Sequence, residues 1–177
     1  MSIRLVIAAI TTAMLLSACG AWQAASDASS EAWRSMFSNN LKVLDVDLRA
    51  REALNPDGRG RATPVAVRIY QLTDRKAFDD ASFADLLNND STVLAHDLLA
   101  SMAAVLNPGA SVSLSQPMQA DTAVVAVVAL YREPGGSANW RRVFDRKELG
   151  GTPLKLTLGD QAIARLDGAS RAGRRSE

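Results

Sequence analysis

The stretch TAVVAVVALY, Thr122–Tyr131, is apolar at every position from Ala123 to Leu130. A strand with one wet face shows alternation, whereas a run that is apolar on both faces is typical of a central strand covered on both sides or paired within a sandwich. The run is too short for a membrane-spanning helix, which needs about 20 apolar residues. We therefore predict a central strand over 122–131.

The segments on either side of this run alternate between apolar and polar residues, as half-buried strands do. In Val65–Tyr70, the valines and Ile69 share one face, while Arg68 and Tyr70 lie on the other, which we assign to solvent. Turn-forming residues separate the strands, above all in the sequence ALNPDGRGRATP, residues 53–64. Further alternating segments are 44–49, 111–115 and 154–158, and 140–144 follows the loop REPGGSANW.

Between Phe78 and Leu99 the apolar period changes to that of a helix. Phe83, Leu86 and Leu87 recur at helical spacing, and Asp79 or Asp80 is placed to cap the start. Leu94 and Leu98 are spaced for a second helical turn. We predict a small helical insertion at about 79–99.

Six or seven short strands with turns between them and one helical interruption predict a mainly β protein, a two-sheet β-sandwich over residues 41–160. Residues 161–177, which end in DGASRAGRRSE, form a polar and basic C-terminal tail that we expect to be disordered.

The N-terminus combines the three parts of a secretory signal: Arg4, a brief apolar run and the small residues Ser17 and Ala18. A transmembrane helix is the alternative, but the run is short and no basic cluster follows it. The signal ends in LSAC, which resembles the bacterial lipobox, where cleavage precedes a cysteine that is then acylated. We expect residues 1–18 to be the lipoprotein signal peptide, Cys19 the lipidation site and 19–40 a tether.

Cys19 is the one cysteine of the chain, so it cannot form an internal disulfide, and a free thiol is a liability in an oxidising compartment. A chance cysteine at this place is the other interpretation. At about 0.8 kcal/mol per buried methylene, several acyl chains hold a protein on a membrane firmly. Gly20 after the cysteine, rather than Asp, points to the outer membrane by resemblance to enterobacterial sorting rules.

Charge gives no indication of nucleic-acid binding. Without Arg4, the one charged residue of 1–18, the 20 basic residues fall to 19, which equals the 19 acidic residues. Such a balance lacks the basic footprint that nucleic-acid binders carry.

Catalytic motifs are missing from the sequence. The single histidine, His96, has no nucleophile motif beside it, and glycine-rich phosphate loops and H-E-x-x-H are absent. The pairs Asp45–Asp47 and Asp79–Asp80 fit a solvated strand face and a helix cap better than a glycosidase cleft. NPDGRG lacks the further ligands of a calcium loop. We predict a protein that is not an enzyme and that holds no metal and no cofactor beyond the covalent lipid.

Three segments resemble a known family in the order in which they occur. PVAVRIYQLTDRKAFDDASFADLL, LNPGASVSL and AVVALYREPGGSANWRRVF are similar to the outer-membrane lipoprotein of bacterial type VI secretion systems, usually called TssJ. The resemblance covers roughly Leu41 to Leu158. It implies a transthyretin-like β-sandwich with a small helical addition, lipid-anchored in the outer membrane and facing the periplasm. It also implies binding to the periplasmic C-terminal domain of the inner-membrane protein TssM, with TssL in the same membrane complex.

In that family the loop between the first two strands contributes to contact with TssM. Here the loop is Leu54–Ala62, and the resemblance makes six of its residues the candidates for partner binding: Asn55, Pro56, Asp57, Gly58, Arg59 and Arg61. A solvated hairpin loop is the alternative. Two other functions stay open, a periplasm-facing lipoprotein that acts as a generic binding module or small-ligand carrier, and a periplasmic hydrolase.

Overall fold

The computed structural model describes residues 42–134 and 138–166. The chain divides into two compact units, Met1–Asn40 and Leu41–Glu177, and the described residues all lie in the second. The predicted signal peptide, the tether, Cys19 and residues 167–177 of the predicted tail therefore lie outside the described residues. Within the described ranges, no helix is long and apolar enough to cross a membrane.

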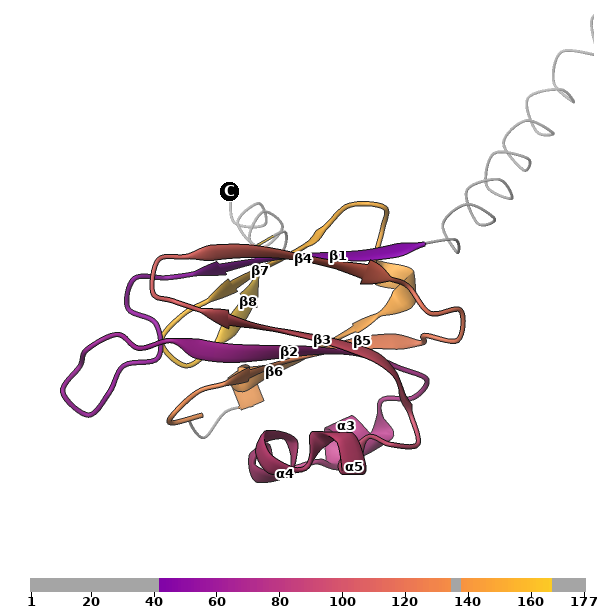
Figure 1. The fold of residues 1–177 in the computed structure, drawn as a ribbon, viewed down its shortest axis with the longest axis horizontal. Coiled ribbons are helices and arrows are strands. Elements are labelled where there is room, and N and C mark those ends of the chain that lie inside the picture. Colours follow the sequence, from indigo (N-terminus) through magenta and orange to yellow (C-terminus); the bar gives the residue numbers. More distant parts are fainter. Residues whose placement is uncertain (1–41, 135–137, 167–177) are drawn as a thin grey trace, which may run out of the picture. The chain divides into compact units, whose positions relative to one another are not determined.

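Two four-stranded sheets form the domain, so the prediction of a mainly β, two-sheet sandwich is confirmed (Figure 1). Sheet A has the strand order β4-β1-β7-β8, and sheet B has the order β3-β2-β5-β6. All pairs are antiparallel except β1 with β7. The strands are β1 Val43–Ala50, β2 Val65–Leu72, β3 Leu98–Leu106, β4 Ser111–Pro117, β5 Val124–Leu130, β6 Arg141–Asp145, β7 Leu154–Leu158 and β8 Ile163–Arg165.

Strand β5 is the centre of the core. It lies between β2 and β6, and every residue from Val124 to Ala129 is at most 5% exposed. One face of sheet B packs on sheet A, and three short helices lie along its other face (Figure 1). The run that is apolar on both faces is thus covered on both faces, as the sequence predicted.

The helical insertion is shorter than predicted and begins earlier. It consists of α3 Lys76–Asp80, α4 Phe83–Asn88 and α5 Asp90–Val93; two 3-10 turns, η1 Ala138–Trp140 and η2 Arg146–Glu148, flank β6. Leu98 and Leu99, assigned to the insertion, belong to β3 instead.

The predicted helix cap is also at a different residue. Asp79 and Asp80 end α3 and pair with Arg75 and Lys76. Ser82 begins α4 in a capping box, in which its hydroxyl accepts from the Asp85 backbone N–H at 3.1 Å, and the Asp85 carboxylate accepts from the Ser82 N–H at 3.0 Å.

The assignment of Arg68 and Tyr70 to solvent was wrong, because the helices cover this part of sheet B. Tyr70 is 1% exposed, and its hydroxyl donates to the Asp90 carboxylate at 2.7 Å. Burial raises the pKa of Tyr70. Arg68 donates to the Leu86 carbonyl at 2.8 Å and lies 3.1 Å from the Asp90 carboxylate.

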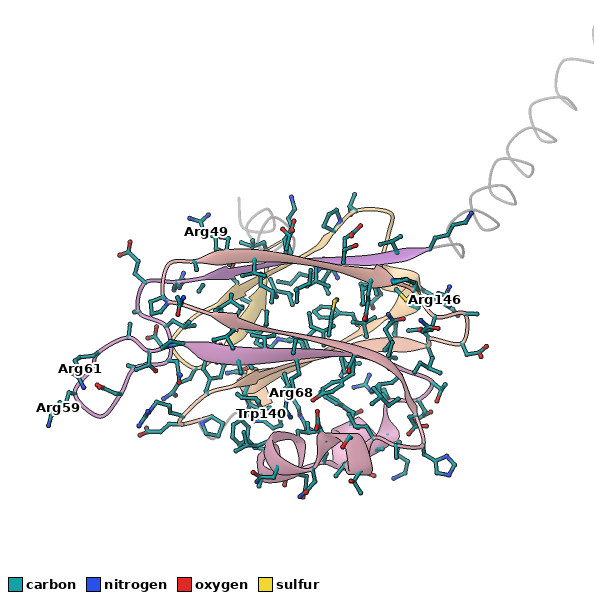
Figure 2. All side chains as sticks on the ribbon, in the orientation of Figure 1. Arg49, Arg59, Arg61, Arg68, Trp140 and Arg146 are labelled. Carbon is teal, nitrogen blue, oxygen red and sulfur yellow. The ribbon has the colours of Figure 1, made fainter. Side chains whose placement is uncertain are left out.

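Arg141 of β6 holds the helices in the same way. Its guanidinium donates to the carbonyls of Phe78 and Ala81 at 3.0 and 3.1 Å, and it lies over the rings of Phe78 and Trp140. The last carbonyls of a helix have no partner within the helix, and a cation there is favourable. Arg141 and Arg68 thus each satisfy the end of one short helix, and Figure 2 shows Arg68 and Trp140 between sheet B and the helices.

A buried glutamine joins the two sheets. Gln71 is fully buried on β2, and its side chain bonds to the connection that leads from β4 in sheet A to β5 in sheet B. Its amide donates to the Pro117 carbonyl at 2.9 Å, and its oxygen accepts from the Gln119 N–H at 2.8 Å and the Thr122 hydroxyl at 2.9 Å. Gln71 thus holds the sheet-to-sheet crossing from within the core, while the Arg146 guanidinium donates to the carbonyls of Gln119, Ala120 and Thr122 in the same connection.

We predict that Gln71→Leu lowers the free energy of unfolding by about 2–4 kcal/mol, because a buried acceptor and two buried donors lose their partner. Gln116→Leu is the matched control, since the Gln116 amide nitrogen is buried without a hydrogen-bond partner among the described residues. Its removal should be neutral or stabilising. Chemical denaturation of both variants is the measurement, and equal losses of stability in the two would contradict the prediction.

Candidate partner-binding end of the sandwich

Four chain connections meet at one end of the sandwich, which we call the loop end. They are the β1–β2 loop, residues 51–64; the β3–β4 turn, 107–110; the start of the β5–β6 connection, 131–134; and the β7–β8 turn, 159–162. Backbone hydrogen bonds join them, from the Gly109 N–H to the Arg51 carbonyl at 3.2 Å and from the Arg51 N–H to the Leu158 carbonyl at 2.8 Å. Lys42, where the described chain begins, lies at the opposite end, which we call the Lys42 end (Figure 1).

Asn55 connects three of these four segments. Its side-chain amide donates to the Thr63 hydroxyl at 3.0 Å and to the Pro64 carbonyl at 2.7 Å, which closes the base of the β1–β2 loop. Its side-chain oxygen accepts from the Arg132 N–H at 2.9 Å, and its own N–H donates to the Asp160 carbonyl at 3.2 Å.

Asn55 also turns the backbone into the loop. Its φ is 45°, and among the described residues it is the one non-glycine residue with a positive φ. Asparagine tolerates this left-handed conformation better than most residues. At 4% exposed, Asn55 supports the loop from below, so its direct contact with a partner stays a prediction that its burial does not favour.

Asp57 organises the tip of the loop. One of its carboxylate oxygens accepts from the backbone N–H groups of Arg59 and Arg61, both at 2.9 Å, and the other accepts from Arg61 Nε at 2.9 Å. These hydrogen bonds, the backbone donors first, lower the pKa of Asp57. Its backbone pairs with Arg61 and, through its carbonyl, with the Gly60 N–H at 2.8 Å. Gly60 has a φ of 75°, which explains a glycine at this position.

The remaining candidates lie where a partner can reach them. Gly58, Arg59 and Arg61 are exposed, while Pro56 and Asp57 are half-buried. Figure 2 shows Arg59 and Arg61 at the far tip of the loop. The Arg61 side chain remains 71% exposed although it pairs with Asp57 at 2.8 Å. The loop therefore presents two cations on a backbone that is hydrogen-bonded at both its tip and its base.

The residues that hold the loop could not be predicted from the sequence. Thr63, Arg132 and Asp160 are distant from Asn55 or outside the predicted loop, and three of their four contacts with it involve backbone atoms, which leave no mark in residue type. The turn Asn107-Pro108-Gly109 was visible as a turn, but only the sheet order places it beside the β1–β2 loop.

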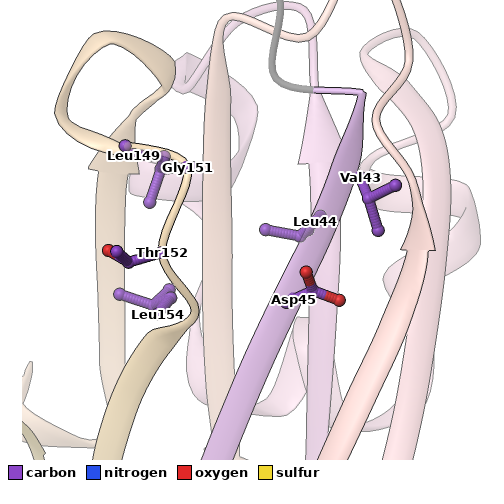
Figure 3. Close-up of a pocket in the computed structure, with 8 residues that line it drawn as sticks. Val43, Leu44, Asp45, Leu149, Gly151, Thr152 and Leu154 are labelled. Carbon is purple, nitrogen blue, oxygen red and sulfur yellow. The ribbon is translucent and has the colours of Figure 1, made fainter.

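Two cavities bear on ligand binding. The one drawn in Figure 3 lies at the Lys42 end, between β1 and residues 149–154, and its volume of about 20 Å³ is enough for one water molecule. The other, of about 510 Å³, is an open depression at the base of the β1–β2 loop, lined in part by Arg49, Arg51, Gly109 and Leu166. It therefore adjoins the loop end instead of entering the core.

The residues with possible catalytic chemistry are dispersed. His96 is exposed in the turn after α5, and the Asp47 carboxylate on β1 accepts from the Ser113 hydroxyl at 2.6 Å. Asp79 and Asp80 are paired on α3. Over the described ranges, no three residues of the types His, Cys, Asp or Glu gather as metal ligands.

Comparison with known proteins gives one family. The profile of the family described as type VI secretion lipoprotein, VasD, EvfM, TssJ, matches residues 42–161. Among curated proteins, none matches the chain.

Solved structures are similar over the same region. A chain of a type VI membrane complex is 36% identical, with a TM-score of 0.67 over 71% of this chain and 98% of that chain. A chain in a structure described as the T6SS protein TssM C-terminal domain (869–1107) from EAEC is 36% identical, with a TM-score of 0.64 over 70% and 99%. The T6SS lipoprotein TssJ1 from Pseudomonas aeruginosa is 31% identical, with a TM-score of 0.63 over 71% and 95%.

The support that Asn55 gives the loop can be measured by two substitutions. Asn55→Gly keeps the positive φ but removes the side-chain hydrogen bonds, so we expect a loss of about 1–3 kcal/mol in the free energy of unfolding. Asn55→Ala loses the same bonds and adds roughly 1 kcal/mol of strain at φ 45°. Chemical denaturation should give the order wild type, Gly, Ala. The control Arg59→Ala, at the exposed tip, should change stability by less than about 0.5 kcal/mol. An Ala variant as stable as the Gly variant would show that the backbone is not held there.

Proposed function

Since this chain belongs to the type VI secretion lipoprotein family, we propose that it anchors the secretion membrane complex to the outer membrane by binding the C-terminal periplasmic domain of TssM. The observation that carries the proposal is the match of almost the whole sandwich to a chain of a type VI membrane complex and to a chain in a structure of the TssM C-terminal domain. TssL belongs to the same complex.

The chain from the lipidated cysteine joins the domain at the end opposite the loop end. Acyl chains on Cys19 hold the chain in the outer membrane, and residues 20–41 lead to the Lys42 end of the domain. The first strand, of eight residues, spans about 27 Å from there to the loop end. The loop end is therefore the end of the domain that does not carry the connection to Cys19, and it is free to meet a periplasmic partner.

The loop end suits a protein partner because it is held in one conformation before binding. Hydrogen bonds to Asn55 and Asp57 fix the base and the tip of the β1–β2 loop, so binding orders few further groups. Arg59 and Arg61 then offer donors to carboxylates or carbonyls of TssM. The neighbouring depression of about 510 Å³ adds a concave surface for a side chain of the partner.

The function is mechanical and not catalytic. Retention in the membrane comes from the lipid, and specificity comes from the loop end. The dispersed carboxylates and the exposed His96 provide no assembled acid, base or nucleophile within the described ranges.

A pair of charge reversals tests the loop end. We expect Arg59→Glu to weaken binding of the periplasmic domain of TssM roughly tenfold, the order of effect of an interface arginine. Lys147→Glu, an equal change of charge on an exposed lysine next to β6 at the Lys42 end, should leave the affinity within about twofold. Calorimetric titration of the two variants gives the affinities, and equal weakening by both would place the interface elsewhere.

The anchor is tested by removing the acylated atom. In cells that express Cys19→Ser, the protein should move from the outer-membrane fraction to the soluble periplasmic fraction, because no acyl chain can be attached. Its affinity for the TssM domain should be unchanged in solution. Continued sedimentation with the outer membrane would refute lipid anchoring while leaving the recognition surface untouched.

A further inference from the structure

The two edge strands along one side of the sandwich contain no charged residue. The edge strands β3 of sheet B and β4 of sheet A are joined by the turn 107–110 and form this side. Residues 98–120, which include both strands, contain no Asp, Glu, Lys or Arg, although 22% of the chain is charged. On the other side, the edge strand β6 contains Arg141, Arg142 and Asp145. The two sides thus differ in charged side chains, which keep edge strands from pairing with other chains.

Strand β3 has the properties of an edge that pairs. It is nine residues long, without Pro, Gly or charge. On its outward face, Leu99 and Val105 are 37% and 64% exposed. On its inward face, Met102 and Ala104 are only partly buried, so the core stays open to solvent along this edge. Within the described ranges its backbone bonds to no strand other than β2.

The sequence of β3 is nearly symmetric about Met102. Reading outward from Met102, the matched positions of LLASMAAVL are Ser101 with Ala103, Ala100 with Ala104, Leu99 with Val105 and Leu98 with Leu106. If two copies of this strand lie antiparallel about a two-fold axis at Met102, each position meets a residue of similar size. On the outward face Leu99 then lies opposite the partner's Val105, an apolar cross-strand pair.

We propose that two copies of this chain associate through their β3 strands, paired antiparallel about Met102, so that the two B sheets become one continuous sheet. The occupant of this edge is a second copy because the strand complements itself in side-chain size and has no like charges to repel its own copy. Pairing covers the partly buried Met102 of each copy with that of the other.

The interface is small, so the dimer is weak in solution. A nine-residue edge buries much less than the roughly 800 Å² per partner of a standard stable interface. Anchored copies confined to one membrane meet at a high effective concentration, which favours a weak contact.

The antiparallel arrangement puts the two Lys42 ends at opposite ends of the dimer. Residues 20–41 reach about 70 Å when extended, enough for both lipids to enter one leaflet.

Sedimentation of the Cys19→Ser chain over a wide range of concentration tests the association. We expect a monomer–dimer equilibrium, and Ala103→Lys should raise the dissociation constant at least tenfold, because it places a lysine beside its own copy. Ala164→Lys, an exposed position on the edge strand β8, is the matched control and should leave the equilibrium unchanged. A chain that stays monomeric at millimolar concentration would overturn the proposal.

Cross-linking tests the register without changing the charge. In the Cys19→Ser background, chains with Ser101→Cys mixed with chains with Ala103→Cys should form disulfide-linked dimers on oxidation, since directly opposite side chains lie within disulfide reach. Chains with Ser101→Cys mixed with chains with Ser113→Cys should not. Equal cross-linking in both mixtures would overturn the pairing. An Ala103→Lys variant that sediments as the wild type but binds TssM more weakly would also overturn the proposal, because β3 would then bind TssM and not a second copy.

Discussion

The burial of both faces of β5 is the constraint on which the rest of the structure depends. A strand in which every residue from Val124 to Ala129 is apolar and buried needs a layer on each side, and a single sandwich partner supplies only one. Sheet A covers one face, and the helices α3, α4 and α5 cover the other. Helices of four to six residues are not stable alone. Arg68 and Arg141 hold α4 and α3 against the sheet by their terminal carbonyls, and Arg68 also pairs with Asp90 of α5, so the two arginines complete the third layer that β5 requires.

A buried amide side chain organises each end of the sandwich. At the loop end, Asn55 satisfies donors and acceptors from three segments, which makes the β1–β2 loop a fixed surface. At the Lys42 end, Gln71 does the same for the crossing between the sheets. Buried amides suit both places, because one side chain offers donors and an acceptor together. A fully satisfied polar group of this kind specifies one loop conformation where an apolar side chain would permit several.

Strict alternation and an unbroken apolar run predicted the strands whose burial follows from their own residue pattern. The strands β1, β2 and β7 alternate, and β5 is apolar throughout. Strand β3 escaped prediction because Leu98–Leu106 is apolar or small on both faces, and β8 because three residues hold too short a pattern. The assignment of Arg68 and Tyr70 to solvent was wrong because a polar residue on one face of a strand indicates a solvent-exposed face in most proteins. Here that face meets helix ends, whose carbonyls need donors. The role of Asn55 was invisible because its partners are mainly backbone atoms brought together by the sheet order.

A dimer through β3 changes how the domain can work in the membrane complex. Because Met102 is at the middle of the strand, pairing about it leaves the loop ends at the two far ends of the dimer, both open. With the lipid anchoring and partner binding proposed above, each dimer would offer two recognition surfaces and two lipid anchors. Bivalent attachment multiplies the retention of a partner when both sites engage, even if each contact is modest. The weakness of a small uncharged interface would then be an advantage, since pairs would form where copies are concentrated on the proposed membrane anchor and separate where they are dilute. The uncharged side and the loop end would thus have complementary roles, one gathering the anchors and the other binding the protein that they hold.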